Sequence, residues 1–373
     1  MFYQFFELQS YIFFYICTNF YNIFHNIFFN EKISVPLHDC RKHAKQTQQT
    51  INQHIANNAM NIYNINEANH LPQGTAVSVG MFDGVHRGHQ KVLRSLGVFA
   101  ENLGSDAMAI TFDRHPRLVL AAENNAFHLL NTNDERFRLI ENCGIDNLLV
   151  IPFTPQVAAL SACQFAHKYL VETLGIKGLL LGYDNMFGNK QNNDFDQIPA
   201  LATQCGFAIA NEGSVSENGT QISSTQIRKA LSNGNIALAN SMLGYTYNTC
   251  GTVVKGRQVG RTLHFPTANI HCSDPLKMLP ADGVYCVTIT IDNQPFDAMC
   301  NIGIQPTFDS QNRTIEVHIF DFLQDIYSKE VTLFFCEKIR DIQRFDSTEK
   351  LVNQLVADKQ KCLQYFARKM EKQ

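Results

Sequence analysis

Two histidines that follow a glycine-bracketed turn are the first residues of this chain whose types and spacing suggest chemistry. Residues 80–89 read GMFDGVHRGH and follow the short apolar stretch AVSV at 76–79. Where a strand leads through glycines into a helix, the helix start presents unpaired backbone N–H groups to an anion. His86 and His89 stand at that turn, where both imidazoles could donate to phosphate oxygens. The alternative is a turn that merely needs glycines, with a histidine as a helix cap.

A second cluster of phosphate-binding residue types lies at the start of another predicted helix. The stretch ISSTQIRKAL at 222–231 places three hydroxyls at the helix N-terminus and an arginine on the same side of its first turn: Ser223, Ser224, Thr225 and Arg228. Hydroxyls in such positions are usually ordinary helix caps. Facing a ligand, they would converge with the guanidinium and the free N–H groups on a triphosphate.

A basic, glycine-rich stretch later in the chain has the residue types of a metal and phosphate site. Residues 251–270 read GTVVKGRQVGRTLHFPTANI, which predicts a strand, a loop, and a proline turn with Thr267 and Asn269 exposed. Their neutral oxygens could bind Mg²⁺ alongside phosphates. Taken alone, the stretch could equally be a solvated loop and a turn.

Apolar strands alternating with helices must position the first two clusters. Strand-like stretches occupy 76–80, 106–112, 147–153 and 177–184, and the residues between them have helical spacing. This alternation predicts a parallel sheet covered on both faces, with its ligand at the carboxyl ends of the strands.

Near residue 245 the pattern changes to shorter, alternating strands. They are expected at 251–256, 283–292, 295–303, 314–322 and 330–339. Their spacing predicts an antiparallel barrel or sandwich, and residues 351–370 predict a closing helix. A chain of 373 residues suits two domains, so we place the boundary between 240 and 250.

Charge and cysteine usage narrow the class of partner and the compartment. The 31 Lys and Arg residues against 34 Asp and Glu give a net charge of -3, which offers no global field for nucleic acid or an anionic membrane. The 11 cysteines include no C-x-x-C pair, so neither a disulfide framework nor a zinc site is expected. Reduced thiols in a cytoplasmic protein are the simpler interpretation, and the oligomeric state stays open.

The first 59 residues fit neither predicted domain. Residues 1–30 are rich in Phe and Tyr, but polar residues interrupt them, so they match neither a secretory signal nor a membrane span of roughly 20 apolar residues. Residues 31–59 form a polar run typical of disorder. We expect translation to begin at Met60 and residues 1–59 to be a disordered or non-native extension; a weak membrane anchor is the alternative.

The first two clusters resemble signatures of nucleotidyl transferases. GMFDGVHRGH resembles the H-x-G-H signature of adenylyl and cytidylyl transferases, and ISSTQIR resembles their S-x-T-x-I-R signature. The stretches ITFDRHPRLVL at 110–120 and LGYDNMFG at 181–188 narrow the likeness to the adenylyltransferase half of prokaryotic bifunctional riboflavin kinase/FAD synthetases. This likeness begins at Met60.

The second part of the chain resembles the kinase half of the same enzymes. The P-T-A-N stretch is followed in order by ADGVYCV, NIGIQPTF and IEVHIFDF. The resemblance covers residues 60 to about 365 and implies an α/β plus β fold. A Rossmann-like nucleotidyltransferase domain at 60–245 precedes a riboflavin kinase domain at 246–373, which is an antiparallel six-stranded β-barrel with a C-terminal helix.

The resemblance implies a transferase with two activities. It would phosphorylate riboflavin to FMN with ATP and then adenylylate FMN to FAD, releasing pyrophosphate, with Mg²⁺ as its metal. Its partners would be the small molecules riboflavin, FMN and ATP. Phosphoryl and adenylyl transfer need in-line positioning and charge neutralisation more than covalent help.

The resemblance also implies roles for individual residues. In adenylyl transfer, catalytic roles fall to His86, His89, Asp184 and Arg228, and ATP contacts to Gly80, Phe82, Asp83, Gly84, Ser223, Ser224 and Thr225. In the kinase, Glu316 would be the general base, Thr267 and Asn269 the Mg²⁺ ligands, and Gly260 and Arg261 ATP contacts. Flavin contacts are implied at His115, Pro116 and Arg340.

Some positions depart from the family pattern. Met81 stands where Asn is usual, residues 188–194 lack the usual Arg and Gly, His264 and Ser328 replace glycines, and residues 340–345 lack a Glu. The changes at Met81 and 188–194 affect the flavin-side loop of the adenylyltransferase half. Those at His264, Ser328 and 340–345 affect loop flexibility and flavin closure in the kinase half, so we expect reduced rather than absent kinase activity. Two alternatives stay open: a riboflavin kinase with a weakened adenylyltransferase half, and a non-catalytic flavin or nucleotide-binding protein.

Overall fold

The computed structural model describes residues 60–120, 127–183, 187–189, 194–217, 219–256, 259–304 and 313–371. From Met60 onward the chain forms one compact unit. Residues 1–59 and Asp184 lie outside the described residues, so the expectations for them stay predictions. The boundary near residue 245 stays a prediction.

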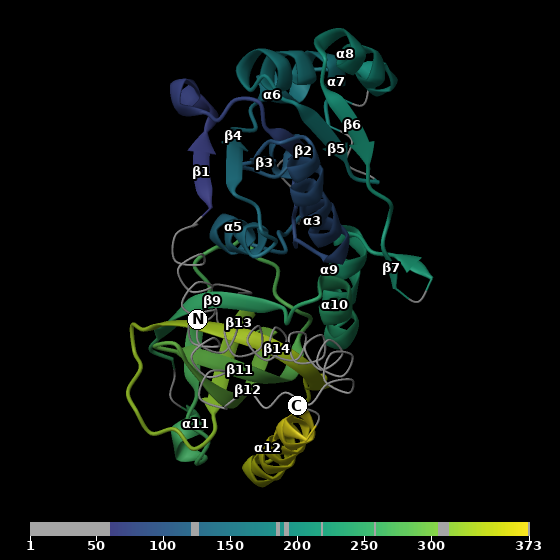
Figure 1. Ribbon diagram of the computed structural model, residues 1–373. Coiled ribbons are helices and arrows are strands. Elements are labelled where there is room, and N and C mark those ends of the chain that lie inside the picture. Colours follow the sequence, from purple (N-terminus) through teal and green to yellow (C-terminus); the bar gives the residue numbers. More distant parts are fainter. Residues whose placement is uncertain are drawn as a thin grey trace, which may run out of the picture. The chain divides into compact units, whose positions relative to one another are not determined.

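The first part of the chain is built on a parallel six-stranded sheet (Figure 1). In sheet order its strands are β1 Asn61–Asn64, β4 Asn147–Ile151, β3 Ala107–Phe112, β2 Ala76–Val79, β5 Gly178–Leu181 and β6 Ala208–Asn211. Every neighbouring pair is parallel. The four central strands are the predicted ones. The order changes direction between β2 and β5, which is where open α/β sheets bind their ligands.

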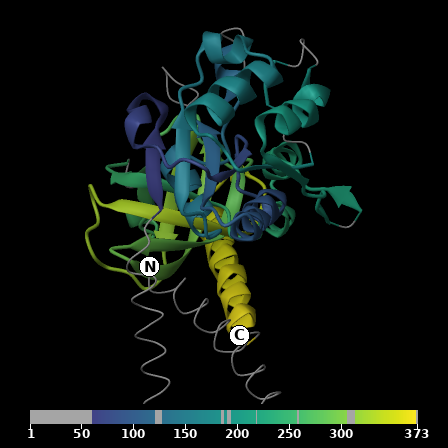
Figure 2. The same ribbon diagram turned by 45° about the horizontal axis from the view of Figure 1, so that its top comes forward.

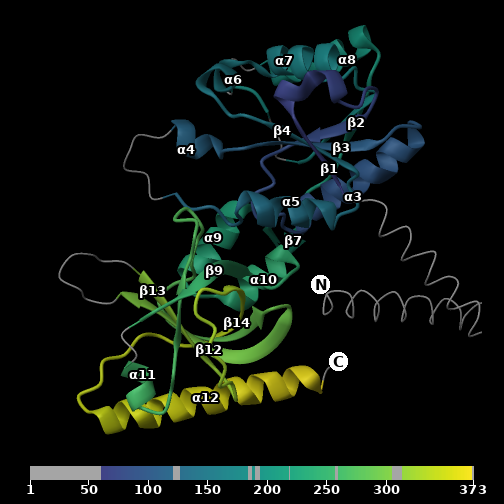
Figure 3. The same cartoon turned by 90° about the vertical axis from the view of Figure 1, so that its left-hand side faces the viewer.

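The central strands are buried on both faces, as the sequence predicts. Val77 and Val79 of β2 belong to one apolar core, which includes Phe165, whereas Ala76 belongs to a second core with Leu93. Figure 3 shows α3 and α5 on one side of the sheet and α7 and α8 on the other. The helices of this part are α3 Arg87–Asn102, α4 Pro116–Leu120, α5 Asn133–Glu141, α6 Pro155–Ala159, α7 Ala162–Phe165 and α8 Ile198–Cys205. A 3-10 turn covers Ile65–His70, another covers Phe195–Gln197, and a π-helical segment covers Ala166–Thr173.

The second part is a closed antiparallel barrel of six strands, which confirms the barrel and not the sandwich. In barrel order the strands are β10 Ala268–His271, β13 Arg313–Ile319, β12 Gln294–Ile304, β11 Gly283–Ile291, β14 Glu330–Arg340 and β9 Asn248–Val254. Strand β10 corrects one expectation. Thr267 and Asn269 do not stand exposed in a turn; both are half-buried, and Asn269 lies inside the strand, paired with β9 and β13.

Helices pack against the core of the barrel and against its outer wall. They are α9 Ser224–Ser232, α10 Ile236–Leu243, α11 Val259–Thr262 and α12 Thr348–Met370, and a small hairpin of β7 Ser216–Glu217 and β8 Thr220–Gln221 precedes them. Ile227 of α9 and Met242 of α10 share one apolar core with the barrel interior. Helix α12, yellow beside the barrel in Figure 2, packs Cys362 and Phe366 against the outer wall.

Candidate active sites

The histidine turn follows the carboxyl end of β2, at the point where the strand order reverses. Gly80 ends the strand by donating its N–H to the carbonyl of Ile110 at 2.9 Å. Phe82, Gly84 and Val85 then adopt positive φ values of 51°, 85° and 33°. Phe82 and Val85 are fully buried although L-residues rarely adopt such angles. A strained, fully packed turn of this kind is typical of a functional site.

His86 and His89 stack on each other at the start of α3. Their ring centroids lie 3.7 Å apart with 14° between the planes. His86 is the helix N-cap, and its Nδ1 accepts the backbone N–H of His89 at 3.3 Å. Nε2 of His86 is therefore the nitrogen that can donate to a ligand. His86 can therefore cap the helix and bind a ligand at the same time, because Nδ1 serves the cap and Nε2 stays available for the ligand.

Both rings are held neutral by their surroundings. Burial lowers the pKa of His86 to about 4, and it lowers the pKa of His89 well below its ordinary value. The Nδ1 atom of His89 is buried and has no hydrogen-bond partner in the part of the chain that the structure describes. A buried nitrogen without a partner costs free energy, so this pair is suited to a bound group that supplies one.

A narrow cavity of about 20 Å³ lies beside the histidine pair. Its other walls are Gly182 and Tyr183, which follow β5, and residues 213–215. The cavity therefore sits between the carboxyl ends of β2 and β5. Near this cavity in sequence, Arg87 forms an ion pair with Glu217 at 2.5 Å, and Lys91 pairs with Glu212 at 2.7 Å.

We expect the depressed pKa of His86 to make the free energy of unfolding depend on pH. His86 takes up a proton near pH 6.5 in the unfolded chain but only near pH 4 in the folded chain. The free energy of unfolding therefore falls as the pH falls from 6.5 to 4. His86→Asn keeps a cap acceptor but removes the titration. Urea unfolding between pH 6.5 and 4 should then show a slope smaller by up to about 1.4 kcal/mol per pH unit. An unchanged slope would contradict the assignment.

Asp83 and Arg228 form a buried ion pair behind the histidine turn. The Asp83 carboxylate is 2% exposed and also accepts the backbone N–H groups of Leu130 at 3.0 Å and of Asn131 at 3.3 Å. Arg228 donates its Nε–H to the carbonyl of His128 at 2.8 Å and lies over the ring of Phe127. Burial raises the pKa of Asp83 and lowers that of Arg228, and the charge of each opposes the shift of the other.

The hydroxyl cluster takes three separate positions at the start of α9. Ser223 is the N-cap, accepting the N–H of Gln226, so the ordinary interpretation holds for it. Ser224 donates its hydroxyl to the carbonyl of Asp83 at 2.7 Å, which joins α9 to the histidine turn. Thr225 is exposed. The two signatures, far apart in sequence, thus meet through Asp83.

The left-handed backbone of Gly84 can be tested by substitution. An added Cβ would meet Cδ1 of Leu130 at 2.7 Å, and its φ of 85° is unfavourable for any other residue. We expect Gly84→Ala to lower the free energy of unfolding by about 1 to 3 kcal/mol. Gly97→Ala in α3 is the matched control, because nothing lies within 4 Å of a Cβ added there. It should raise the free energy of unfolding by roughly 0.5 to 1 kcal/mol. Equal effects at both glycines in urea unfolding would contradict the strain.

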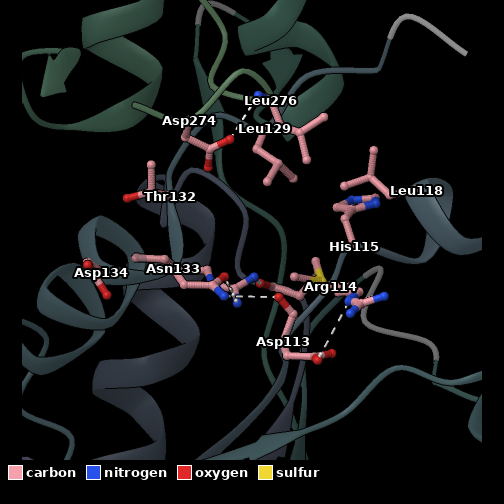
Figure 4. A pocket seen from close by; sticks show the side chains of 12 residues that line it. Asp113, Arg114, His115, Leu118, Leu129, Thr132, Asn133, Asp134, Asp274 and Leu276 are labelled. Atoms are coloured by element: carbon pink, nitrogen blue, oxygen red, sulfur yellow. Dashed lines mark hydrogen bonds and ion pairs between the residues drawn. The ribbon is translucent and has the colours of Figure 1, made fainter. Parts of the chain in front are cut away.

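A larger cavity, of about 250 Å³, opens after β3 (Figure 4). His115 and Leu118 form one wall, and Asn133 of α5 lies at another, where its amide donates to the carbonyl of Asp113 at 3.0 Å. Burial and nearby arginines lower the pKa of His115 to about 3, so its ring is neutral. Pro116 begins α4 directly after it.

Arg136 is a residue of this cavity that the sequence patterns miss. It is 2% exposed and donates to the carbonyls of Met81 at 3.0 Å and Phe112 at 2.7 Å, so it ties the ends of β2 and β3 together. Its only sequence signal is a charged residue one helical turn before Ile140, on the apolar face of α5. Because Arg136 binds the backbone carbonyl of Met81, the contact does not depend on which side chain stands at position 81.

The barrel brings the predicted kinase residues together through strand pairing. Asn269 of β10 and Asn301 of β12 stand directly opposite Glu316 of β13, on its two sides. Ile315 and Val317 are buried inside the barrel, so Glu316 points to the other face of the sheet, and it is half-buried there. Asn301 lies in a family-like stretch, but sequence alone does not single it out.

Two glycines pack against the proposed metal ligands. A Cβ added at Gly256 would collide with the amide of Asn269, and one at Gly260 would collide with the carbonyl of Phe265 and lie 3.4 Å from the hydroxyl of Thr267. The absence of side chains at the two glycines therefore leaves room beside Thr267 and Asn269. The neutral oxygens of these two residues are a donor set that suits Mg²⁺ with phosphates. Arg261 lies in α11, but its side chain is outside the described ones.

Arg340 has a different environment from the one expected. Its guanidinium forms a two-pronged ion pair with the fully buried Asp358 of α12, with Nε and Nη2 at 2.9 and 2.8 Å from Oδ2. Its Nη1 donates to the carbonyl of Asp341 at 3.0 Å. These contacts fasten α12 to the barrel and leave little of the head group for a flavin.

Two departures from the family pattern coincide with left-handed backbone. His264 has a φ of 60° and Ser328 a φ of 63°, angles that favour glycine. A glycine would adopt these angles without strain, whereas this chain accepts strain of about 1 kcal/mol or more at each position.

Comparison with known proteins identifies the family. A FAD synthetase family model matches residues 68–226 and a riboflavin kinase family model matches residues 243–366. The bifunctional riboflavin kinase/FMN adenylyltransferase of Escherichia coli K12 is 35% identical over 309 residues, which are 82% of this chain and 96% of that protein. The chain belongs to the bifunctional riboflavin kinase/FMN adenylyltransferase family. The family protein of Bacillus subtilis is 33% identical over 297 residues, or 79% of this chain and 93% of the relative.

A solved structure shares the fold of this family member. The crystal structure of a protein described as a macrolide-efflux protein from Streptococcus pneumoniae superposes with a TM-score of 0.73 at 33% identity. It covers 80% of this chain and 97% of the other. Among the described helices of this chain, none is long and apolar enough to cross a bilayer.

Proposed function

We propose that this chain makes FMN and then FAD, with one reaction in each half. The kinase half transfers the γ-phosphoryl group of ATP to the ribityl hydroxyl of riboflavin. The adenylyltransferase half lets the FMN phosphate attack the α-phosphorus of ATP, which releases pyrophosphate. One observation carries the proposal: the chain aligns with 96% of the length of a relative named for both activities, so both halves are present in order.

In adenylyl transfer, His86 and His89 would bind the ATP phosphates through ring N–H groups. Both residues line the cavity at the end of β2, and the start of α3 adds a positive dipole end. Arg228, Ser224 and Thr225 would hold the leaving pyrophosphate, with Ser223 capping their helix and Gly80, Phe82 and Gly84 shaping the turn. Neutral imidazoles donate hydrogen bonds as charge builds up on the phosphate oxygens.

Asp83 receives a modified role in this proposal. Its carboxylate is already bound by two backbone N–H groups and Arg228, so it orients Arg228 instead of binding ATP directly. Asp184 stays a predicted catalytic residue. His115 and Pro116 would contact the flavin beside the larger cavity, where a neutral imidazole and apolar Leu118 suit an aromatic ring.

In the kinase reaction, Glu316 would accept the proton of the riboflavin hydroxyl. Thr267 and Asn269 would hold Mg²⁺, which when bound neutralises charge on the ATP phosphates, and Gly260 and Arg261 would contact ATP. The register that places Asn269 opposite Glu316 supports a single site for the metal ligand and the base. Arg340 would serve the flavin side indirectly, by fastening α12 to the barrel.

We further propose a cytoplasmic location, with FMN adenylyltransferase at 60–245 and riboflavin kinase at 246–373. Free thiols at the exposed Cys205 and Cys250 suit a reducing compartment.

The test is a product assay on the purified chain. Riboflavin, ATP and Mg²⁺ should yield FMN first and FAD later, separated by chromatography. FMN without FAD would favour a riboflavin kinase with a weakened adenylyltransferase half. Tight FMN binding without ATP consumption would favour a binding protein, and no flavin nucleotide would overturn the proposal.

A further inference from the structure

Residues 274–278 of the barrel half bind residues 128–131 of the α/β half. This barrel segment, between β10 and β11, forms a bridge with Leu129. Leu129 donates its N–H to the carbonyl of Leu276 at 2.7 Å, and Met278 donates its N–H to the carbonyl of Leu129 at 2.8 Å. The two halves are thus joined by main-chain hydrogen bonds.

Lys277 adds a buried charge to this junction. It is 3% exposed, and its Nζ lies 2.5 Å from a carboxylate oxygen of Glu135 and donates to the carbonyl of Leu130 at 2.8 Å. The same ammonium lies over the ring of Tyr247, 4.7 Å from its centroid. Burying a lysine is costly unless it is fully paired, and neither proposed reaction uses this one.

The opposite side of the same segment holds the adenylyltransferase residues. Leu130 and Asn131 donate their N–H groups to Asp83, and the carbonyl of His128 accepts from Arg228. Residues 128–131 are therefore held by Lys277 on one side and orient the Asp83–Arg228 pair on the other. A shift of the segment would move the guanidinium away from its place.

The barrel segment also reaches the larger cavity. Asp274 and Leu276 line it, facing the side of the cavity that carries His115 and Leu118 (Figure 4). The kinase half thus supplies both a wall of that cavity and the support of Arg228.

We propose that Lys277 is a positioning residue of the adenylyltransferase site, contributed by the kinase half. It acts by fixing residues 128–131, which set the orientation of Arg228 through Asp83 and His128. This inference rests on the proposed adenylyltransferase function, and it adds a dependence of that reaction on the neighbouring half of the chain.

Steady-state kinetics on the full chain test the proposal. Lys277→Met should lower kcat/KM for FMN adenylylation roughly 10- to 100-fold, because misplacement remote from the reacting atoms has effects of this size. Riboflavin phosphorylation by the same preparation should stay unchanged, which also reports that the barrel is folded. Lys329→Met is the matched control, since it removes a lysine from a surface ion pair with Asp292.

A double-mutant cycle separates positioning from a general loss of structure. In the Arg228→Ala background, Lys277→Met should cost almost nothing further, because its effect passes through Arg228. The full loss persisting in that background, or unchanged adenylylation by Lys277→Met alone, would overturn the proposal. If Lys277→Met loses kinase activity through misfolding, the double variant Lys277→Met, Glu135→Gln also removes the unpaired carboxylate. It should then keep kinase activity and lose adenylylation to the same extent. Absence of FAD from the unaltered chain would instead contradict the proposed function.

Discussion

Replacing His89 by alanine is expected to lower the rate of FMN adenylylation about 10²- to 10³-fold, the size seen when one aimed donor to a developing oxyanion is removed. The ring of His89 stacks on His86 beside the cavity at the end of β2, and its buried Nδ1 has no hydrogen-bond partner among the described residues. Riboflavin phosphorylation should be unaffected, because the residues proposed for it lie in the barrel half of the chain. Initial rates with FMN and with riboflavin measure the two reactions separately.

His167→Ala is the matched control for the loss of a histidine in the same half. His167 lies in the π-helical segment with its side chain 56% exposed, and it is paired with the exposed Glu172. Its removal should leave both rates unchanged. A His89 variant that keeps its rate of FAD formation, or a folded one that loses both reactions, would refute the assignment.

Replacing Glu316 by glutamine should have the reverse effect. We expect riboflavin phosphorylation to fall about 10²- to 10⁴-fold, the usual contribution of a general base, while adenylylation of added FMN continues. Glutamine keeps the volume and the register between Asn269 and Asn301 but cannot accept the proton. The measurement is FMN formation from riboflavin at saturating ATP and Mg²⁺.

Glu337→Gln is the control for a carboxylate of the same barrel. Glu337 lies exposed on β14, paired in register with Cys286. It should retain both activities. Full kinase activity in Glu316→Gln would exclude that residue as the base, whereas a pH profile that loses its acidic limb would support it.

Much of the fold could be predicted because burial leaves a pattern in the sequence. The four central strands are apolar on both faces, and the barrel strands alternate, so their residue types follow from their environment. The edge strands β1 and β6 are short and half-exposed, so NIYN and AIAN carry no such pattern. Strand β10 is missed because the proline and the polar residues of its start resemble a turn.

The sites could be predicted as motifs but not as networks. The histidines and the hydroxyls were found from local spacing, because each cluster lies within one turn and one helix start. The partners of these residues are far away in the chain: Asp83 and Arg228 are separated by 145 positions, and Glu135 and Lys277 by 142. No local pattern predicts which buried charge meets which, so the ion pairs of Asp83 with Arg228 and of Arg340 with Asp358 are seen only in the structure.

A mixing experiment tests most directly whether two separate sites in this chain act in succession. The His89→Ala and Glu316→Gln variants are each supplied with riboflavin, ATP and Mg²⁺, first alone and then in an equal mixture, and FAD is measured over time. We expect almost no FAD from either variant alone, accumulation of FMN by His89→Ala, and recovery of FAD formation in the mixture. Rapid FAD formation by either variant alone, or none in a mixture that accumulates FMN, would contradict the assignment of one reaction to each half.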